Sequence, residues 1–273
     1  MELTVQNRRA WAYTGGKAFD PALPCIVFLH GALHDHSVFT LLARSFAHRG
    51  HAVLALDLPA HGRSEGPPLD SLEAAGAWAL AVLDAAGVQR AAWVGHSMGS
   101  LMALEAAAQA PERATHLALL GTAAPMAVSE ALLHTAATQP VTAMKMVNTF
   151  SHSSIANKPG YPGPGGWLHG ANQALMERTQ AGWSGSNLFL QDFQLCNGYS
   201  GALAAAARVS CPSTVVMGRQ DAMTPPRAAK PLVEALKAHT VTLPCGHALM
   251  QEDPEGLRAA LFTALLEQPA QRR

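Results

Sequence analysis

Val94-Gly95-His96-Ser97-Met98-Gly99 joins an apolar run to a run of helix-forming residues, and this stretch decides the fold of the chain. The run before it, residues 90–94, ends in Ala-Ala-Trp-Val and is typical of a short buried strand. The run after it, residues 98–110, is rich in Leu, Met, Ala and Glu, which favour a helix. A strand that becomes a helix so abruptly forces the residue between them into a strained conformation. Glycine two positions before and after the serine removes side chains that would block such a turn.

The stretch therefore predicts a nucleophile elbow, in which the serine hydroxyl stands above the edge of a sheet. The N-terminus of the following helix adds partial positive charge where an oxyanion would form. The bare pattern G-x-S-x-G also occurs by chance in loops, so it is the strand and the helix around it that favour the elbow. A serine hydroxyl is a poor nucleophile at neutral pH, so the chain must also supply a histidine base and a carboxylate that orients it.

Candidates for both partners come later in the chain, each just after a predicted strand. Residues 214–217 predict one strand, and Asp221 lies past its end, before a helix that two prolines open. Residues 240–243 predict another strand, and His247 lies in the loop that follows it. Other acidic residues do not combine a strand end with this order; they are Asp57, Asp84, Asp192 and Asp253.

The order of serine, aspartate and histidine resembles that of the α/β-hydrolase superfamily, and the resemblance spans nearly the whole chain. It implies that Ser97 is the nucleophile, His247 its general base and Asp221 the carboxylate that orients the base. Some members of the superfamily carry the acid after the strand that follows the nucleophile helix, near residues 120–123, where this chain has no carboxylate. Because serine rather than aspartate stands at the nucleophile position, the resemblance disfavours haloalkane dehalogenase and epoxide hydrolase chemistry.

The first buried strand is predicted at residues 25–29, and it leads into His30-Gly31-Ala32, where the family has its oxyanion loop. The resemblance therefore implies that the backbone N–H groups of Ala32 and Met98 are the two oxyanion donors. His30 is expected to form structural hydrogen bonds rather than to act as an acid or base. Residues 57–64 follow a further predicted strand and are similar to a turn that the family carries there. We expect this turn to brace the rim of the site.

The wider pattern predicts an α/β fold with a doubly wound, mostly parallel sheet and an inserted, mainly helical cap. Strand-like and helix-like segments alternate up to about residue 120, stop, and resume with the strand at residue 214. We expect residues 1–121 and 206–273 to form two parts of one core domain. Residues 122–205 are expected to form the cap.

The cap is expected to line part of the substrate pocket. One or two helices are expected within residues 131–146 and another within residues 171–180. Residues 159–167 hold too much glycine and proline for regular structure, which makes them a candidate lid. The apolar side chains of the cap suffice for a small core and a pocket wall. Together with residues beside the serine, the set expected to contact substrate is Gly31, His96, Trp167 and Trp183.

Thirteen histidines raise the question of a metal site, because His34-Asp35-His36 places ligand types close together. This short motif lacks the remaining ligands of a recognisable site, so we expect no metal, and the proposed chemistry requires no organic cofactor. His96 is also expected to support the elbow. Three other histidines are expected at the border of the pocket without a catalytic role: His61, His152 and His169.

Composition agrees with an ordinary enzyme that acts on small molecules. The chain has 273 residues, of which 49% are hydrophobic, and 19 acidic residues balance 19 basic ones. Zero net charge without a basic cluster argues against nucleic acid or stable membrane association, and it leaves the oligomeric state open. The first twelve residues have no long apolar core, and the four cysteines lack metal spacing, so a cytoplasmic protein with reduced thiols is expected.

The most direct functional prediction is a serine hydrolase that cleaves carboxylic esters of small to medium apolar molecules through an acyl-enzyme. The superfamily also contains lactonases and carbon-carbon bond hydrolases of meta-cleavage products, which remain alternatives. The carbon-carbon bond hydrolases often have a pair of glycines at the elbow and a tryptophan after the catalytic histidine. In this chain Ser100 follows the elbow glycine and Ala248 follows His247. Perhydrolases of the family tend to have an aromatic residue and a proline after the oxyanion glycine. They are less favoured here, because Ala32-Leu33 follows Gly31. An alternative of another class is a ligand receptor that keeps the three residues but turns over slowly.

Overall fold

The computed structural model describes residues 1–155, 160 and 166–266, and within them eight strands form one sheet. The strand order is β1-β2-β4-β3-β5-β6-β7-β8. The first two strands pair antiparallel, and every pair from β4–β3 to β7–β8 is parallel. The strands are β1 (Glu2–Val5), β2 (Arg8–Tyr13), β3 (Cys25–Leu29), β4 (Ala52–Asp57), β5 (Ala91–His96), β6 (Ala114–Leu120), β7 (Ser213–Gly218) and β8 (His239–Leu243). The predicted fold class, a doubly wound and mostly parallel sheet, is confirmed.

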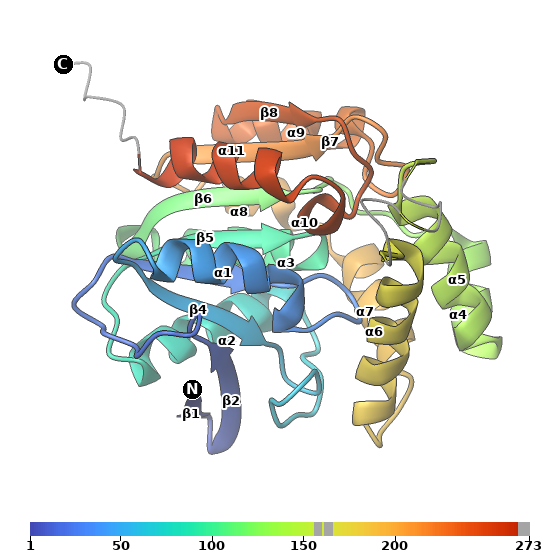
Figure 1. Ribbon diagram of the computed structural model, residues 1–273, viewed down its shortest axis with the longest axis horizontal. Coiled ribbons are helices and arrows are strands. Elements are labelled where there is room, and N and C mark those ends of the chain that lie inside the picture. The colour runs from blue at the N-terminus through green and yellow to red at the C-terminus, as the bar shows by residue number, and fades with distance from the viewer. Residues whose placement is uncertain (156–159, 161–165, 267–273) are drawn as a thin grey trace.

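Helices cover both faces of this sheet (Figure 1). Successive side chains of a strand point to opposite faces, so Val27 and Leu29 of β3 join one apolar cluster while Ile26 and Phe28 join the other. The first cluster includes helices α2 (Leu72–Ala85), α3 (Met98–Gln109), α8 (Ala202–Ala206) and α9 (Pro226–Leu236). The second includes η1 (His36–Phe39), α1 (Thr40–Ala47), α10 (Leu249–Glu252) and α11 (Pro254–Leu266). A short turn of helix, η2 (Pro111–Arg113), precedes β6.

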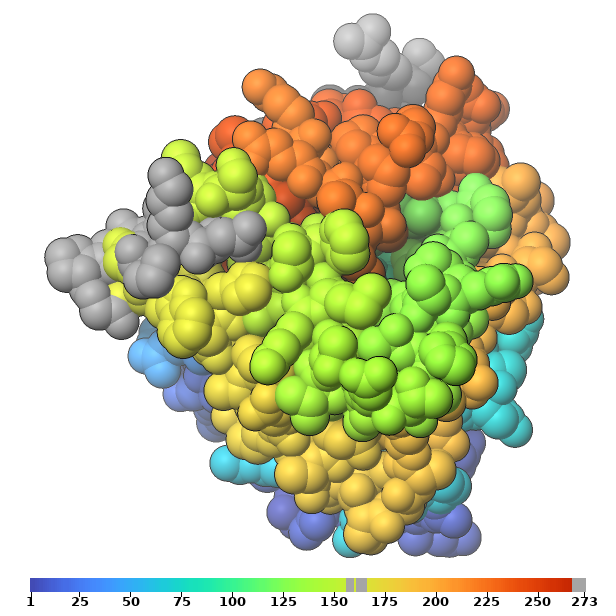
Figure 2. Space-filling view, turned by 90° about the vertical axis from the view of Figure 1, so that its right-hand side faces the viewer, coloured from blue at the N-terminus to red at the C-terminus, as the bar shows by residue number. Residues whose placement is uncertain are grey.

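Among the described residues between β6 and α8, four helices are inserted beside the carboxyl ends of the parallel strands (Figure 1). They are α4 (Glu130–Thr138), α5 (Pro140–Ser151), α6 (Leu168–Gly182) and α7 (Leu188–Gly198). Figure 2 looks onto this end of the molecule, where their surface covers the sheet edge. Their buried apolar side chains form a third cluster together with Leu33 and Ala60, which belong to loops at the sheet edge. The insertion therefore packs directly on the loops that follow β3 and β4.

The inserted helices differ in detail from the expected ones. Of the one or two helices expected within residues 131–146, the structure has two, because Pro140 occupies the first position of α5 and ends the preceding hydrogen-bond pattern. The helix expected at 171–180 is longer, spanning all of α6. Of the candidate lid at residues 159–167, residues 159 and 161–165 lie outside the described part of the chain. The division into domains at residues 121 and 205 stays a prediction.

Candidate active site

Ser97 sits at the junction of β5 and α3 with φ 53° and ψ −122°, a conformation that side-chain-bearing residues rarely adopt. Its backbone N–H donates to the carbonyl of Leu120 over 2.9 Å, which ties the junction to β6. A Cβ on Gly95 would lie 2.0 Å from the carbonyl oxygen of Gly99, and one on Gly99 would lie 2.2 Å from that of Leu29. Both glycines are therefore required by close backbone contacts, as the sequence predicted.

The N-terminus of α3 lies directly after the serine. Ser97 is the residue before the first helical turn, so the Met98 amide has no partner within the helix. Ala32 lies in the loop after β3 and is followed by Leu33, which is fully buried with φ 53°. The positive φ of Leu33 turns the chain sharply just after the expected oxyanion donor.

Asp221 and His247 are in direct contact at the ends of β7 and β8. His247 Nδ1 donates to Asp221 Oδ2 over 2.8 Å, and the Thr224 hydroxyl donates to the same oxygen over 2.8 Å. The other carboxylate oxygen accepts the backbone N–H groups of Met223 and Thr224. Burial alone would raise the pKa of Asp221, but the charge of His247 and these hydrogen bonds outweigh it and hold the pKa below its usual value. Asp221 is therefore an ionised acceptor that fixes the imidazole.

Three elements hold the loop that carries His247. Its backbone N–H and that of Ala248 both donate to the carbonyl of Ser151, at the end of α5, over 2.7 and 3.0 Å. His96 Nε2 donates to the His247 carbonyl over 2.8 Å. Gly121, with φ 54°, lies so near that a Cβ there would be 3.1 Å from the imidazole ring. The position of His247 therefore depends on β5, on the loop after β6 and on the inserted helices.

Ser97 and His247 line one small cavity of about 30 Å³. Its polar and small lining residues are Gly31, Ala32, His34, His96, Ser97, Ser151, Asn172 and His247, and its apolar ones are Val147, Met176, Phe193 and Met223. A larger open cleft of about 430 Å³ lies beside α7 and the start of α2 and contains neither Ser97 nor His247. We therefore take the small cavity, where the chemistry-bearing side chains meet, as the candidate site.

Two of the four residues expected to contact substrate line this cavity, namely Gly31 and His96. Trp167 and Trp183 do not line it, and their contact with substrate stays a prediction. Trp183 packs against the apolar cluster of the inserted helices, and Trp167 is 53% exposed with its ring against Gly170. The Trp183 ring thus packs within the cap, and the Trp167 ring lies on its surface.

Cys245 lies two residues before His247, and its thiol is buried. Burial, together with the charges of nearby carboxylates, raises the pKa of this thiol to about 12. A thiol with so high a pKa is not a nucleophile at neutral pH. Ser97 is left as the nucleophile candidate in this cavity.

Sequence reasoning missed Asp192, which α7 places beneath the expected oxyanion loop. It is 1% exposed, and its Oδ2 accepts the backbone N–H of Leu33 over 2.8 Å and His61 Nε2 over 3.0 Å. His61 Nδ1 donates to the carbonyl of Pro59 over 2.9 Å. Both ring nitrogens face acceptors, so both carry a proton. Burial lowers the pKa of His61, but the charge and hydrogen bond of Asp192 outweigh it and raise the pKa overall.

The signal for this residue was present in the sequence. Asp192 falls within the apolar stripe of α7, where the other buried positions are Leu188, Phe189, Phe193 and Cys196. An acid on the buried face of an amphipathic helix needs a buried partner. The partner, His61, was expected at the pocket border but does not line the cavity. His152 and His169 do not line it either.

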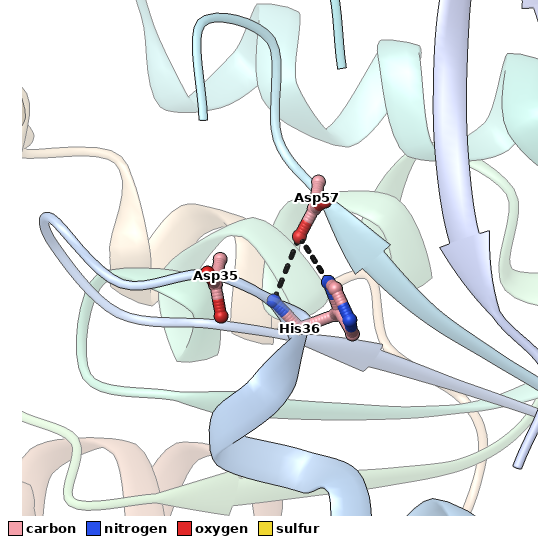
Figure 3. Close-up of side chains that lie close together, drawn as sticks. All are labelled: Asp35, His36 and Asp57. Carbon is pink, nitrogen blue, oxygen red and sulfur yellow. Dashed lines mark hydrogen bonds and ion pairs between the residues drawn. The ribbon is translucent and has the colours of Figure 1, made fainter. Parts of the chain in front are cut away.

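The histidine motif considered as a metal site belongs to a structural network. Asp35, His36 and Asp57 offer ligand atoms within 4.8 Å of one another (Figure 3). Asp57 Oδ1 accepts the backbone N–H of His36 over 2.8 Å and its Nδ1 over 2.7 Å, and Oδ2 accepts the Arg63 N–H over 2.8 Å. Asp35 pairs with Arg178 of α6 over 2.8 Å. These oxygens already hold the loops after β3 and β4 together, so the absence of a metal here stays our prediction.

Comparisons with known proteins agree on the family. The model of the alpha/beta hydrolase fold family matches residues 24–254. The pimeloyl-[acyl-carrier protein] methyl ester esterase of Chromobacterium violaceum is 31% identical over 223 residues, 78% of this chain and 82% of that protein. A putative carbamate hydrolase RutD of Klebsiella pneumoniae is 26% identical, covering 90% of this chain and 92% of its own length. Some matches are partial: a putative non-heme haloperoxidase of Mycobacterium phage D29 is 37% identical over 100 residues, which are 36% of this chain and 36% of that protein.

Among solved structures, the enol-lactonase from Burkholderia xenovorans LB400 superposes with a TM-score of 0.83, 18% identity and coverage of 97% of this chain and 99% of that one. A thermophilic esterase gives a TM-score of 0.79, 20% identity and coverage of 98% and 97%. At these identities the likeness concerns the fold. Within the described residues, no helix is both long and apolar enough to cross a membrane.

Proposed function

This chain belongs to the α/β-hydrolase fold family, and from that premise we propose that it is a serine hydrolase that cleaves carboxylic esters through an acyl-enzyme. One observation carries the proposal. Ser97, strained at the start of α3, lines the same cavity as His247, whose Nδ1 is fixed by the ionised Asp221. A nucleophile, a base and an orienting carboxylate in this relation are the parts that acyl transfer requires.

In the proposed mechanism, Asp221 keeps the Nδ1 proton of His247 in place, so the lone pair of Nε2 is free to accept a proton. Nε2 takes the Ser97 proton as the hydroxyl oxygen attacks the ester carbonyl. The resulting imidazolium is stabilised by the Asp221 charge and then protonates the departing alcohol. Water activated by the same Nε2 releases the acid from the acyl-enzyme.

The backbone N–H groups of Met98 and Ala32 are proposed as donors to the oxyanion of the tetrahedral intermediate. Met98 supports this role because its amide begins α3 and has no helical partner. Loss of one such donor typically costs about 3 kcal/mol of transition-state stabilisation. The loop of Ala32 is held from the cap by the bond between Asp192 and Leu33. The proposed oxyanion site thus depends on both the sheet and the inserted helices.

The size of the cavity supports a short acyl group. At about 30 Å³, it has room for about two water molecules, so a longer chain requires the inserted helices to separate from the core. Four apolar side chains in the cavity lining favour a largely uncharged substrate. A lactone offers the same carbonyl to Ser97 as an open-chain ester, which makes lactone hydrolysis the second candidate. The four free cysteines support our proposal that the protein works in a reducing compartment such as the cytoplasm.

The proposal is tested by hydrolysis of p-nitrophenyl esters from acetate to decanoate, measured for the wild type and for Ser97→Ala. We expect activity to be highest for the shortest acyl chains and to vanish in the variant. Ser45→Ala, a substitution of a partly buried serine on α1 that does not line the cavity, is the matched control and should keep the activity. A fluorophosphonate should label residue 97, as located by mass spectrometry of peptides. Activity that survives in Ser97→Ala would overturn the mechanism.

A further inference from the structure

Two histidines in the cavity wall have ring nitrogens that the proposed mechanism does not use. His34, in the loop after β3, and His96, at the end of β5, both line the cavity, and their rings stack with centroids 6.4 Å apart. The Nδ1 atoms of both rings are buried and have no hydrogen-bond partner among the described residues. Buried polar atoms are normally paired, so each unpaired one calls for an explanation.

The contacts of His96 determine which of its nitrogens carries the proton. Nε2 lies 2.8 Å from the carbonyl oxygen of His247, which can only accept, so Nε2 carries the proton. Burial, reinforced by neighbouring histidines, lowers the pKa of His96 well below its usual value. The ring is therefore neutral, and its Nδ1 carries a lone pair. A Cβ built on Gly31 would lie 3.1 Å from this Nδ1 and 3.1 Å from Ser97 Cβ, which places the lone pair beside the proposed nucleophile.

A chain of amide contacts determines the proton position in His34. Asn148 Nδ2 donates to the carbonyl of His169 over 2.6 Å, so Asn148 Oδ1 is the acceptor that receives Asn172 Nδ2 over 3.1 Å. Asn172 Oδ1 must then accept from His34 Nε2, 2.9 Å away. Burial lowers the pKa of His34 to about 4, so this ring is also neutral with a lone pair on Nδ1. Both histidines thus present acceptors and no donors.

We propose that His34 and His96 form a polar subsite that binds a hydrogen-bond donor, a hydroxyl or N–H group, carried on the substrate near the scissile carbonyl. The inference rests on the proposed ester hydrolysis and names its preferred substrate class: short esters or lactones with such a donor. A carbonyl or carboxylate at the same position would face two lone pairs and be disfavoured. The apolar residues of the same cavity, Met176 and Phe193 among them, would contact the remaining carbon chain.

The kinetic test compares ethyl butanoate with ethyl 2-hydroxybutanoate and ethyl 3-hydroxybutanoate, each enantiomer separately, by acid release at constant pH. We expect kcat/KM of the wild type to be about tenfold higher for at least one hydroxy ester, the scale of one or two neutral hydrogen bonds. In His34→Gln the side-chain amide can still donate to Asn172, but nothing replaces Nδ1. The preference should fall toward one in this variant.

His116→Gln is the matched control, because His116 is a partly buried histidine of β6 that bonds Thr214 and does not line the cavity. It should keep the wild-type preference. Equal kcat/KM for all the esters in the wild type would overturn the subsite. So would a preference that persists unchanged in His34→Gln.

A binding measurement separates failure of the subsite from failure of the proposed function. In Ser97→Ala, the ¹⁵N resonances of the His34 and His96 Nδ1 atoms are followed as the hydroxy esters or ethyl butanoate are added. We expect the hydroxy esters alone to shift at least one Nδ1 resonance in the direction of hydrogen bonding. If no ester is hydrolysed but these shifts occur, the hydrolase proposal fails and the subsite stands. Absence of the shifts at the highest soluble ester concentration overturns the subsite.

Discussion

Replacing Asp192 by Asn isolates the charge of this buried carboxylate from its hydrogen bonds. In the wild type a single oxygen, Oδ2, accepts both from Leu33 and from His61, so an amide oxygen in that place can keep both contacts. What the amide cannot do is hold His61 charged. His61 must then give up one proton and lose its bond either to residue 192 or to the carbonyl of Pro59.

The expected loss of stability in Asp192→Asn is the smaller of two free-energy costs. Keeping the imidazolium buried without its counter-charge would cost about 3–5 kcal/mol. Losing the proton instead leaves one buried acceptor unpaired, at about 1–3 kcal/mol. We therefore expect Asp192→Asn to lower the free energy of unfolding by about 1–3 kcal/mol at pH 6, measured from the urea midpoint at unchanged slope.

The difference should depend on pH with a definite sign. Because the folded protein raises the pKa of His61, the stabilisation is fully present below the unfolded value near 6.5 and is lost as pH rises through the folded pKa. The gap between wild type and variant should therefore narrow from pH 6 to pH 9. Asp84→Asn, which breaks an exposed pair with Arg113, is the control and should cost less than about 1 kcal/mol. A gap that is absent at pH 6, or equal at both pH values, would refute a charged His61.

Three further predictions concern the proposed triad and its surroundings. Asp221→Asn should lower kcat by about 10⁴ with little change in KM, because the amide no longer selects the Nδ1–H form of His247; a loss under tenfold would contradict this. Gly121→Ala should lower activity sharply at nearly wild-type folding by circular dichroism, since its Cβ meets the imidazole at 3.1 Å with φ 54°. Prolonged treatment with a chelator should leave both kcat and the melting temperature unchanged, because the oxygens of Asp35 and Asp57 are already engaged; a loss restored by a divalent metal would show otherwise.

The parts of the site that the sequence predicted are those that contiguous segments determine. Apolar run, glycine, serine, glycine and helix formers lie within about twenty residues, so the conformation of Ser97 could be inferred without knowledge of distant contacts. Asp221 and His247 were recognisable because each follows a short run typical of a strand, apolar and buried in β7 and alternating threonine with apolar residues in β8. Strands β1 and β2 were not predicted. Their turn places Gln6 and Asn7 at φ 51° and 62°, without the glycine that usually indicates such a hairpin.

The contacts that were missed join residues far apart in the chain. Asp192 lies 131 residues after His61 and 159 after Leu33, and nothing local to either partner specifies the pairing. Trp183 illustrates the same limit for a predicted substrate contact. A large aromatic side chain in a cap segment suggested a pocket wall, and the structure packs this ring against the apolar cluster of the inserted helices. Which apolar side chains face a ligand depends on how helices pack against each other, and helical periodicity alone does not determine that.

The inserted helices contribute to the geometry of the proposed reaction as well as covering it. The Ser151 carbonyl at the end of α5 accepts two backbone N–H groups of the His247 loop, and Asp192 of α7 accepts the N–H of Leu33. Each contact is a buried hydrogen bond to a loop that carries a reacting group, so a shift of either helix moves the base or the oxyanion donor. An opening of these helices wide enough to admit a long acyl chain would break both contacts. The proposed preference for short substrates therefore rests on these hydrogen bonds as well as on the volume of the cavity.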